Sequence, residues 1–161
     1  MEVMMWNRLI VMCCFCLVFT GGMSSCQRVG IDAVNKINFV RHIGEKRVFF
    51  DYDKFDINEA SVDVLLDVVK VLQTNPNIEV TVIGHTDNRG SYEYNIVLGE
   101  KRADAVKRFM VNCTSYLEDR IKTTSRGEAE PLVYVQDDSK NSKYEKQHAR
   151  NRRVEFLFSR K

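Results

Sequence analysis

The pattern of apolar and polar residues predicts alternating strands and helices from about residue 46 onward. Four short runs, each apolar or alternating, predict strands at 48–50, 78–83, 121–125 and 154–158. Two longer segments between them carry apolar residues three and four positions apart, which is typical of amphipathic helices. Strands that alternate with helices in this way indicate a sheet with helices packed on one face.

The first predicted helix begins after Asn58, whose side chain can cap it, and ends at the turn residues 75–77. Its apolar positions form one stripe that we expect to be buried: Val62, Leu65, Leu66, Val69 and Leu72. The second helix follows the polar loop 84–90, and four of its residues are expected to face the core: Ala103, Val106, Phe109 and Met110. Residues 136–150 are polar and charged, which predicts a loop with a short surface helix.

The first 26 residues have a different composition from the rest of the chain. Arg8 precedes the apolar run 9–19, and small residues follow at 20–22, an order that is typical of a secretory signal peptide. The run is about half of the roughly 20 residues that are needed to span a bilayer, so a permanent transmembrane helix is not expected. Glu2 is unusual in such a basic leader, and translation starting at Met4 or Met5 is an alternative.

The segment Met23-Ser24-Ser25-Cys26 resembles the bacterial lipobox, in which small residues precede a cysteine that becomes the acylated mature N-terminus. Met23 departs from the usual Leu, and an ordinary signal peptidase site with an incidental cysteine is the alternative. The position of Cys26 at the end of the leader favours lipidation, and several acyl chains would give a stable membrane anchor. We therefore expect a signal peptide over 1–25, a lipid anchor and tether over 26–45, and a folded domain over 46–161.

The charge is nearly balanced, with 24 Lys and Arg against 22 Asp and Glu, so no nucleic-acid partner is expected. The cysteines have no paired spacing for disulfides or zinc, and Cys113 is expected to be a small buried residue near a helix end. His85 has no second ligand at metal spacing and is expected to be a structural hydrogen-bonding residue. Neither a metal, a cofactor nor a catalytic nucleophile with an oriented base is expected.

Four sequence blocks resemble, in order and spacing, the family of OmpA-like peptidoglycan-binding domains. They are Val48-Phe49-Phe50-Asp51-Tyr52-Asp53, the Gly84–Gly90 loop, the Tyr94–Ala103 segment and Asn151-Arg152-Arg153-Val154-Glu155. Within that family, Glu93-Tyr94-Asn95 is similar to the peptidoglycan-associated lipoproteins, whereas Thr86 is closer to the general OmpA pattern. The resemblance implies an α+β fold, a two-layer α/β sandwich of β-α-β-α-β-β order with a mixed sheet.

The resemblance also implies a site. Members of the family bind the diaminopimelate residue of the peptidoglycan stem peptide, and the matching positions assign its ammonium group to Asp87 and a carboxylate to Arg102. The planar guanidinium fork suits a carboxylate because it can donate two parallel hydrogen bonds. Further expected contacts are Asn95, Thr86 and one of the two arginines Arg152 and Arg153, and the sequence does not decide which arginine it is. Asp53 is a weaker candidate for ligand contact. The alternative for Asp87 and Arg102 is an intramolecular salt bridge, which contributes little at a surface.

The function implied by the resemblance is a non-enzymatic one. The domain would face the periplasm and bind the cell wall without covalent bonds. Because the lipid anchor would lie in the outer membrane, this binding would connect that membrane to the wall. Tol envelope proteins are the expected protein partners. The alternative is a peptidoglycan hydrolase, which would be expected to carry a zinc set or a catalytic pair; a motor stator subunit would need a transmembrane helix.

Lipidation at Cys26 is directly testable. Metabolic labelling with a palmitate analogue is expected to mark the wild-type chain and a Cys113→Ala control, and to leave Cys26→Ala unlabelled, because only Cys26 ends the lipobox-like segment. Equal labelling of the Cys26→Ala chain would contradict acylation at this residue.

Overall fold

The computed structural model describes residues 37–135 and 142–161. The predicted signal peptide, Cys26 and most of the predicted tether lie outside the described residues. Residues 39–161 form one compact unit. In the described part of the chain, no helix is both long and apolar enough to cross a membrane.

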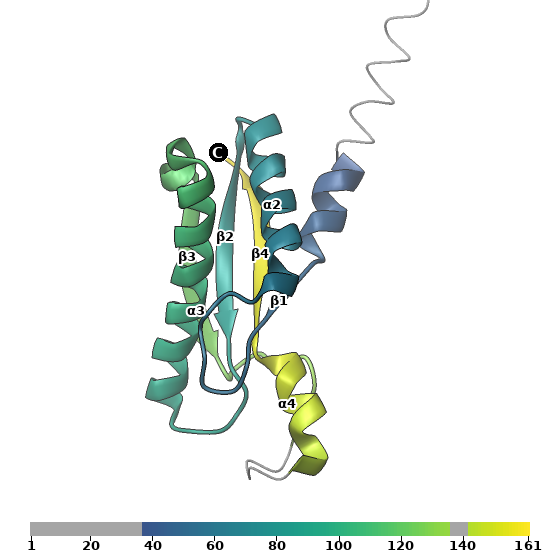
Figure 1. Cartoon of the computed structure of the whole chain (residues 1–161), viewed down its shortest axis with the longest axis vertical. Coiled ribbons are helices and arrows are strands. Elements are labelled where there is room, and N and C mark those ends of the chain that lie inside the picture. Colours follow the sequence, from purple (N-terminus) through teal and green to yellow (C-terminus); the bar gives the residue numbers. More distant parts are fainter. Residues whose placement is uncertain (1–36, 136–141) are drawn as a thin grey trace, which may run out of the picture. The chain divides into compact units, whose positions relative to one another are not determined.

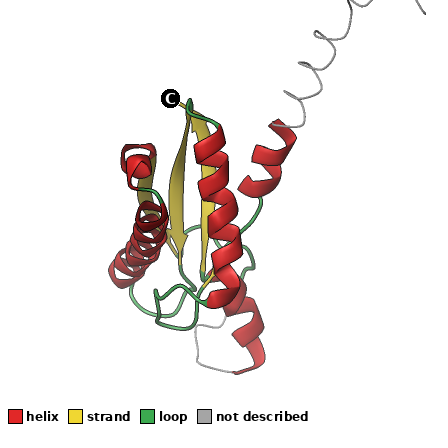
Figure 2. Ribbon diagram, turned by 45° about the horizontal axis from the view of Figure 1, so that its top comes forward, coloured by secondary structure: helices red, strands yellow, loops and turns green. Residues whose placement is uncertain are grey.

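A mixed four-stranded sheet forms one layer of the fold (Figure 1). Its strands are β1 (Val48–Phe49), β2 (Ile78–His85), β3 (Ile121–Gly127) and β4 (Arg153–Arg160). They lie in the order β1-β4-β2-β3, with β4 antiparallel to both β1 and β2, and β3 parallel to β2. The helices α2 (Glu59–Thr74) and α3 (Tyr92–Cys113) form the second layer (Figure 2). The predicted α+β sandwich with a mixed sheet is therefore confirmed.

Both long helices begin at polar side chains that cap them. The Asn58 side chain accepts a hydrogen bond from the Ser61 amide at 3.0 Å, and Ser91 accepts one from the Tyr94 amide at 3.2 Å. Each cap satisfies a backbone N–H group that the first helical turn would otherwise leave without a partner. The predicted cap at Asn58 and the predicted end of the first helix before residues 75–77 are both confirmed.

The hydrophobic core lies between the helices and the sheet. Its members on α2 are Leu65, Val68, Val69, Val71 and Leu72. The prediction that Leu66 belongs to this buried stripe is wrong, because that side chain is 47% exposed. Successive helical residues differ by about 100° in direction, so a helix that turns Leu65 and Val69 to the sheet points Leu66 away from it.

Cys113 is exposed, and the prediction that it is buried is wrong. It is the last residue of α3, and the chain leaves the helix there to form the 3-10 helix η1 (Ser115–Arg120). Met110 before it and Leu117 after it are both fully buried in the core. The core beneath this end of α3 is thus filled by neighbours on either side of the cysteine.

Two short helices outside the main layers also contribute buried residues. Residues 37–44 are helical, and Ile43 belongs to the core cluster. After η2 (Ser142–Tyr144), α4 (Glu145–Asn151) corresponds to the short helix predicted within 136–150. It is more than a surface element, because His148 is buried and Asn151 hydrogen-bonds both the N–H and the C=O group of Val133 at 2.9 and 2.8 Å.

Helix α3 approaches strand β2 most closely at two glycines. A Cβ atom placed on Gly84 would lie 1.8 Å from the carbonyl oxygen of Gly99, and one placed on Gly99 would lie 2.3 Å from the Ser125 hydroxyl. No side chain fits between these backbones, so the pair of glycines fixes how near α3 lies to the sheet.

His85, at the end of β2, is buried, and neither ring nitrogen has a hydrogen-bond partner in the described structure. The sequence predicts that the His85 ring forms structural hydrogen bonds, but no described group bonds to it. Burial lowers the pKa of His85 to about 4, and the nearby positive charge of Arg153 acts in the same direction. The fold thus holds this imidazole in its neutral form.

We expect Gly84→Ala to reduce the free energy of unfolding by about 2–3 kcal/mol, because an added methyl group must displace the α3 backbone. Gly44→Ala is the matched control: its nearest heavy atom would lie 3.5 Å from the new Cβ, an ordinary contact. Urea denaturation followed by circular dichroism compares the two variants. Equal stability of Gly84→Ala and wild type would contradict the close approach.

The stability of the domain is expected to fall as the pH drops from 6.5 toward 4. The pKa of His85 is about 4 when folded and about 6.5 when unfolded, so the unfolded state binds the proton first. At pH 4.5 the loss should reach about 2–3 kcal/mol relative to pH 7. Between pH 6.5 and 4, the denaturant midpoint should depend less on pH in His85→Gln than in the wild type. An equal pH dependence of the midpoint in both proteins would assign the loss of stability to another group.

Candidate ligand-binding site

Three segments that are distant in sequence meet at one end of the sheet (Figure 1). They are the loop between β1 and α2, the loop between β2 and α3, and the chain from α4 into β4. Hydrogen bonds of two arginines join them: Arg102 on α3 reaches the β1–α2 loop, and Arg152 bonds the carbonyl oxygen of Phe50 at 3.0 Å. The predicted site residues lie in or beside these segments.

Asp87 is buried between two guanidinium groups. Its Oδ2 atom accepts hydrogen bonds from Arg89 Nη2 at 2.5 Å and Nε at 3.2 Å, and from Arg152 Nη1 at 3.0 Å. Burial alone would raise the pKa of the Asp87 carboxyl, but the hydrogen bonds and charges of both arginines outweigh it and lower that pKa. Asp87 is therefore ionised at neutral pH and paired within the chain.

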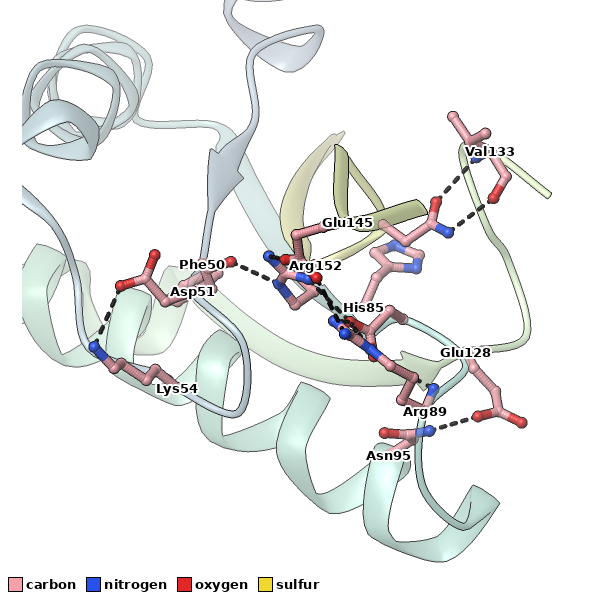
Figure 3. Close-up of polar contacts among 12 residues, drawn as sticks. Phe50, Asp51, Lys54, His85, Arg89, Asn95, Glu128, Val133, Glu145 and Arg152 are labelled. Atoms are coloured by element: carbon pink, nitrogen blue, oxygen red, sulfur yellow. Dashed lines mark hydrogen bonds and ion pairs between the residues drawn. The ribbon is translucent and has the colours of Figure 1, made fainter. Parts of the chain in front are cut away.

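Glu145 completes an ion-pair network with Asp87, Arg89 and Arg152. Figure 3 labels Glu145 beside Arg89 and Arg152. One carboxylate oxygen of Glu145 lies 2.8 Å from Arg152 Nη2, and the other lies 3.1 Å from Arg89 Nη1. The network contains two anions and two cations and has no net charge. It connects the β2–α3 loop to α4 and β4. Arg89 also stacks over the ring of Tyr52 at 4.1 Å, a cation–π contact.

Arg102 is 0% exposed, and its described hydrogen-bond partners are all neutral. Its guanidinium donates to the carbonyl oxygens of Lys54 and His85, each at 2.9 Å, and of Asp51 at 3.2 Å. Burial lowers the pKa of Arg102 to about 10, so the group stays charged at neutral pH. In the described structure Asp87 pairs with Arg89 and Arg152, and no salt bridge links it to Arg102.

Thr86 and Asn95 each leave an oxygen atom without a partner. The Thr86 N–H group bonds the Gly127 carbonyl at 2.9 Å, and the Asn95 amide nitrogen donates to Glu128. Thr86 Oγ1 and Asn95 Oδ1 are buried and have no hydrogen-bond partner among the described residues. A buried acceptor without a donor destabilises the chain, so both positions favour a ligand that donates hydrogen bonds.

The structure separates Arg152 from Arg153. Arg152 belongs to the ion-pair network beside Asp87, whereas Arg153 bonds Glu155 at 2.8 Å and the carbonyl oxygens of Asn151 and Glu130. Asp53 is exposed, has a positive φ of 56°, and accepts a hydrogen bond from the Tyr94 hydroxyl. The structure thus places Asp53 at the edge of the site and Arg153 in a separate set of contacts.

Sequence reasoning missed two members of the network. Arg89 lies two residues after Asp87 in the Gly84–Gly90 block, so its position could have identified it. Glu145 lies in a polar stretch with no recognisable motif, and only the fold brings it to the arginines. Among the described residues there is no group of His, Cys, Asp and Glu that could hold a metal ion.

Comparisons with known proteins identify the family of the chain. Residues 49–145 match the OmpA family. The peptidoglycan-associated lipoprotein of Legionella pneumophila is 36% identical over 109 residues, which cover 68% of this chain and 57% of that protein. The corresponding protein of Haemophilus influenzae is 40% identical over 96 residues, covering 60% of this chain and 62% of that protein.

Solved structures show the same fold. The crystal structure of the peptidoglycan-associated lipoprotein from Burkholderia pseudomallei has a TM-score of 0.61 and 29% identity, covering 71% of this chain and 91% of that one. The OmpA-like domain of FopA1 from Francisella tularensis has a TM-score of 0.58 and 25% identity, covering 71% of each chain. The chain spans 57% and 62% of the length of the two curated relatives above. Because the family match covers more than half of the sequence, the chain belongs to the OmpA family.

Proposed function

We propose that this protein is a peptidoglycan-associated lipoprotein whose domain binds the wall without catalysing a reaction on it. The observation that carries the proposal is the buried Arg102 guanidinium, which has three neutral acceptors and no carboxylate partner in the described structure. A buried cation without an anion is costly, so a ligand carboxylate would be stabilised there. The ligand that we propose is the diaminopimelate residue of the stem peptide.

The carboxylate of diaminopimelate fits Arg102 for a geometric reason. A guanidinium carries five N–H donors, and three acceptors engage it in the described structure. Because the side chain is fully buried, ligand entry requires the loop of residues 51–54 to move from its carbonyl contacts. The ligand carboxylate would take the place of neutral carbonyl oxygens as the acceptor of the Arg102 hydrogen bonds. Hydrogen bonds to a charged acceptor are stronger than those to a neutral one.

The ammonium group of diaminopimelate has three oxygen acceptors available nearby in sequence and fold. Thr86 Oγ1 and Asn95 Oδ1 lack hydrogen-bond donors among the described residues. Asp87 Oδ1 accepts one long bond of 3.4 Å, from the Arg89 N–H group, whereas Oδ2 takes the closer arginine contacts. An ammonium group carries three N–H donors, which matches this number of acceptors.

The cellular setting follows from the same assignment. Acylation of Cys26 would anchor the chain in the outer membrane with its domain facing the periplasm, and wall binding would then tether that membrane. Tol proteins are the proposed partners. The names of the relatives from Legionella and Haemophilus support the lipoprotein assignment. The resemblance of Glu93-Tyr94-Asn95 to the peptidoglycan-associated lipoproteins as a family supports the Tol assignment.

We expect the full chain to bind a diaminopimelate stem peptide about tenfold to a hundredfold more tightly than the same peptide with lysine in that position. Lysine lacks the distal carboxylate, so Arg102 keeps its neutral acceptors and gains no anion. Calorimetric titration of both peptides measures the ratio. Arg102→Lys should lose most of the preference for diaminopimelate, because an ammonium group cannot form the bidentate hydrogen bonds that a guanidinium forms with a carboxylate. Arg108→Lys, at an exposed position of the same helix, should retain it.

Two results would count against the proposal. Equal affinity for both peptides, with Arg102→Lys shown to be folded by circular dichroism, would place the ligand elsewhere. A drop in the turbidity of purified cell walls on adding the wild-type chain would favour the hydrolase alternative over pure binding.

A further inference from the structure

We infer that Arg89 and Arg152 form a second carboxylate subsite, which Glu145 occupies in the ligand-free chain. On binding, a carboxylate of the stem peptide other than that of diaminopimelate takes the place of Glu145. This inference rests on the proposed function and deepens it, since it identifies the residues that recognise a second negative charge on the same peptide.

The contacts of Glu145 are those of a bridging anion. Its two oxygens each accept from a different guanidinium, Oε1 from Arg152 at 2.8 Å and Oε2 from Arg89 at 3.1 Å. A peptide carboxylate has the same shape, charge and acceptors, so it can make the same two charge-assisted bonds. Glu145 therefore shows where such a group would bind.

Glu145 differs from the rest of the ion-pair network in its access to solvent. Its side chain is 43% exposed, whereas those of Arg89, Arg152 and Asp87 are 5–6% exposed. An ion pair that reaches water is weak because solvent screens it and competes for the charges. Glu145 is thus the one member of the network that a dissolved ligand can replace without entering the protein interior.

The two arginines stay in place when Glu145 leaves. Asp87 holds both of them from the buried side, at 2.5 Å for Arg89 and 3.0 Å for Arg152. Arg152 also bonds the carbonyl oxygen of Phe50, which lies outside the loop of residues 51–54. The subsite is therefore formed before the ligand arrives, which reduces the entropy lost on binding.

Charge determines what can replace Glu145. Without it, the network holds two cations and one anion, so a positive charge remains uncompensated in a mostly buried place. A neutral group would leave that charge unpaired, and a cation would add to it, whereas a carboxylate restores neutrality. The subsite therefore selects an anion.

Arg152 also lines a groove on the protein surface, and Glu145 lies at the start of α4. A groove of about 340 Å³ lies between the end of β1 and α4, and its lining includes Phe50, Ala149, Arg150 and Arg152. Glu145 is the first residue of α4, and no described side chain caps that end, whereas the other end carries the bonds between Asn151 and Val133. The end of α4 that carries Glu145 is thus joined to the domain through the two ion pairs that a ligand carboxylate would replace.

Calorimetry on the full chain tests the inference with two ligands and three proteins. The ligands are a diaminopimelate stem peptide and the same peptide with every carboxylate except that of diaminopimelate converted to an amide. The proteins are wild type, Glu145→Gln and Glu118→Gln, which removes the same charge from an exposed position on η1. Glu145→Gln should bind the unmodified peptide roughly tenfold more tightly than wild type, because no internal carboxylate competes.

The amidated peptide should gain nothing from Glu145→Gln, and Glu118→Gln should behave as wild type with both ligands. Weaker or unchanged binding of the unmodified peptide by Glu145→Gln would overturn the inference and assign Glu145 a purely structural role. So would an equal gain for both peptides. Binding of neither peptide by wild type would instead overturn the proposed function itself.

A second measurement does not depend on the folding of any variant. The guanidinium ¹H–¹⁵N signals of Arg89 and Arg152 in the wild-type chain should shift when the unmodified peptide is added, because their carboxylate partner changes. Saturating amidated peptide should leave the Nη contacts to Glu145 intact and produce a smaller shift, which comes only from its ammonium group at Asp87. Identical shifts with both peptides would contradict the exchange.

Discussion

The backbone contact between Gly84 on β2 and Gly99 on α3 determines where the rest of the site can be. Since neither position leaves space for a side chain, α3 lies against the strand at a fixed height. Arg102 follows Gly99 by about one helical turn and Asn95 precedes it by about one turn, so both lie on the face of α3 that Gly99 turns toward the sheet. A bulkier residue at the contact would move both of them together.

Charge at that end of the sheet is arranged in two different ways. The ion-pair network balances two carboxylates against two guanidinium groups within the chain, and such a neutral set needs no external ion. Arg102 instead donates to three carbonyl oxygens and forms no salt bridge in the described structure. Buried ion pairs often contribute little net stability and serve geometric specificity instead. In this chain they join α4 to the β2–α3 loop.

Much of the fold could be predicted from the sequence because it depends on local rules. The Asn58 cap, the turn at 75–77 and the spacing of apolar residues on α3 each act within a few residues. The side-chain environment of Leu66 and Cys113 could not be predicted, because it depends on which way a helix faces and on what fills the core at its end. The same limit applies to Glu145, whose partners are set by tertiary contacts. For Arg102, family resemblance identified the residue, but its burial against backbone carbonyls emerged only from the packing of the β1–α2 loop.

The order of the strands has a consequence for how the chain matures. The last strand, β4, lies between β1 and β2, so the first two strands have no direct contact with each other in the sheet. A nascent chain that lacks its final residues cannot close the sheet, and pairings between the two ends of a sequence are slow to form because a long loop must first be ordered. Arg152 immediately precedes this strand. The pair of Arg89 and Arg152 therefore assembles only after the chain has been made beyond Arg152, and a product truncated before that residue would lack half of the pair.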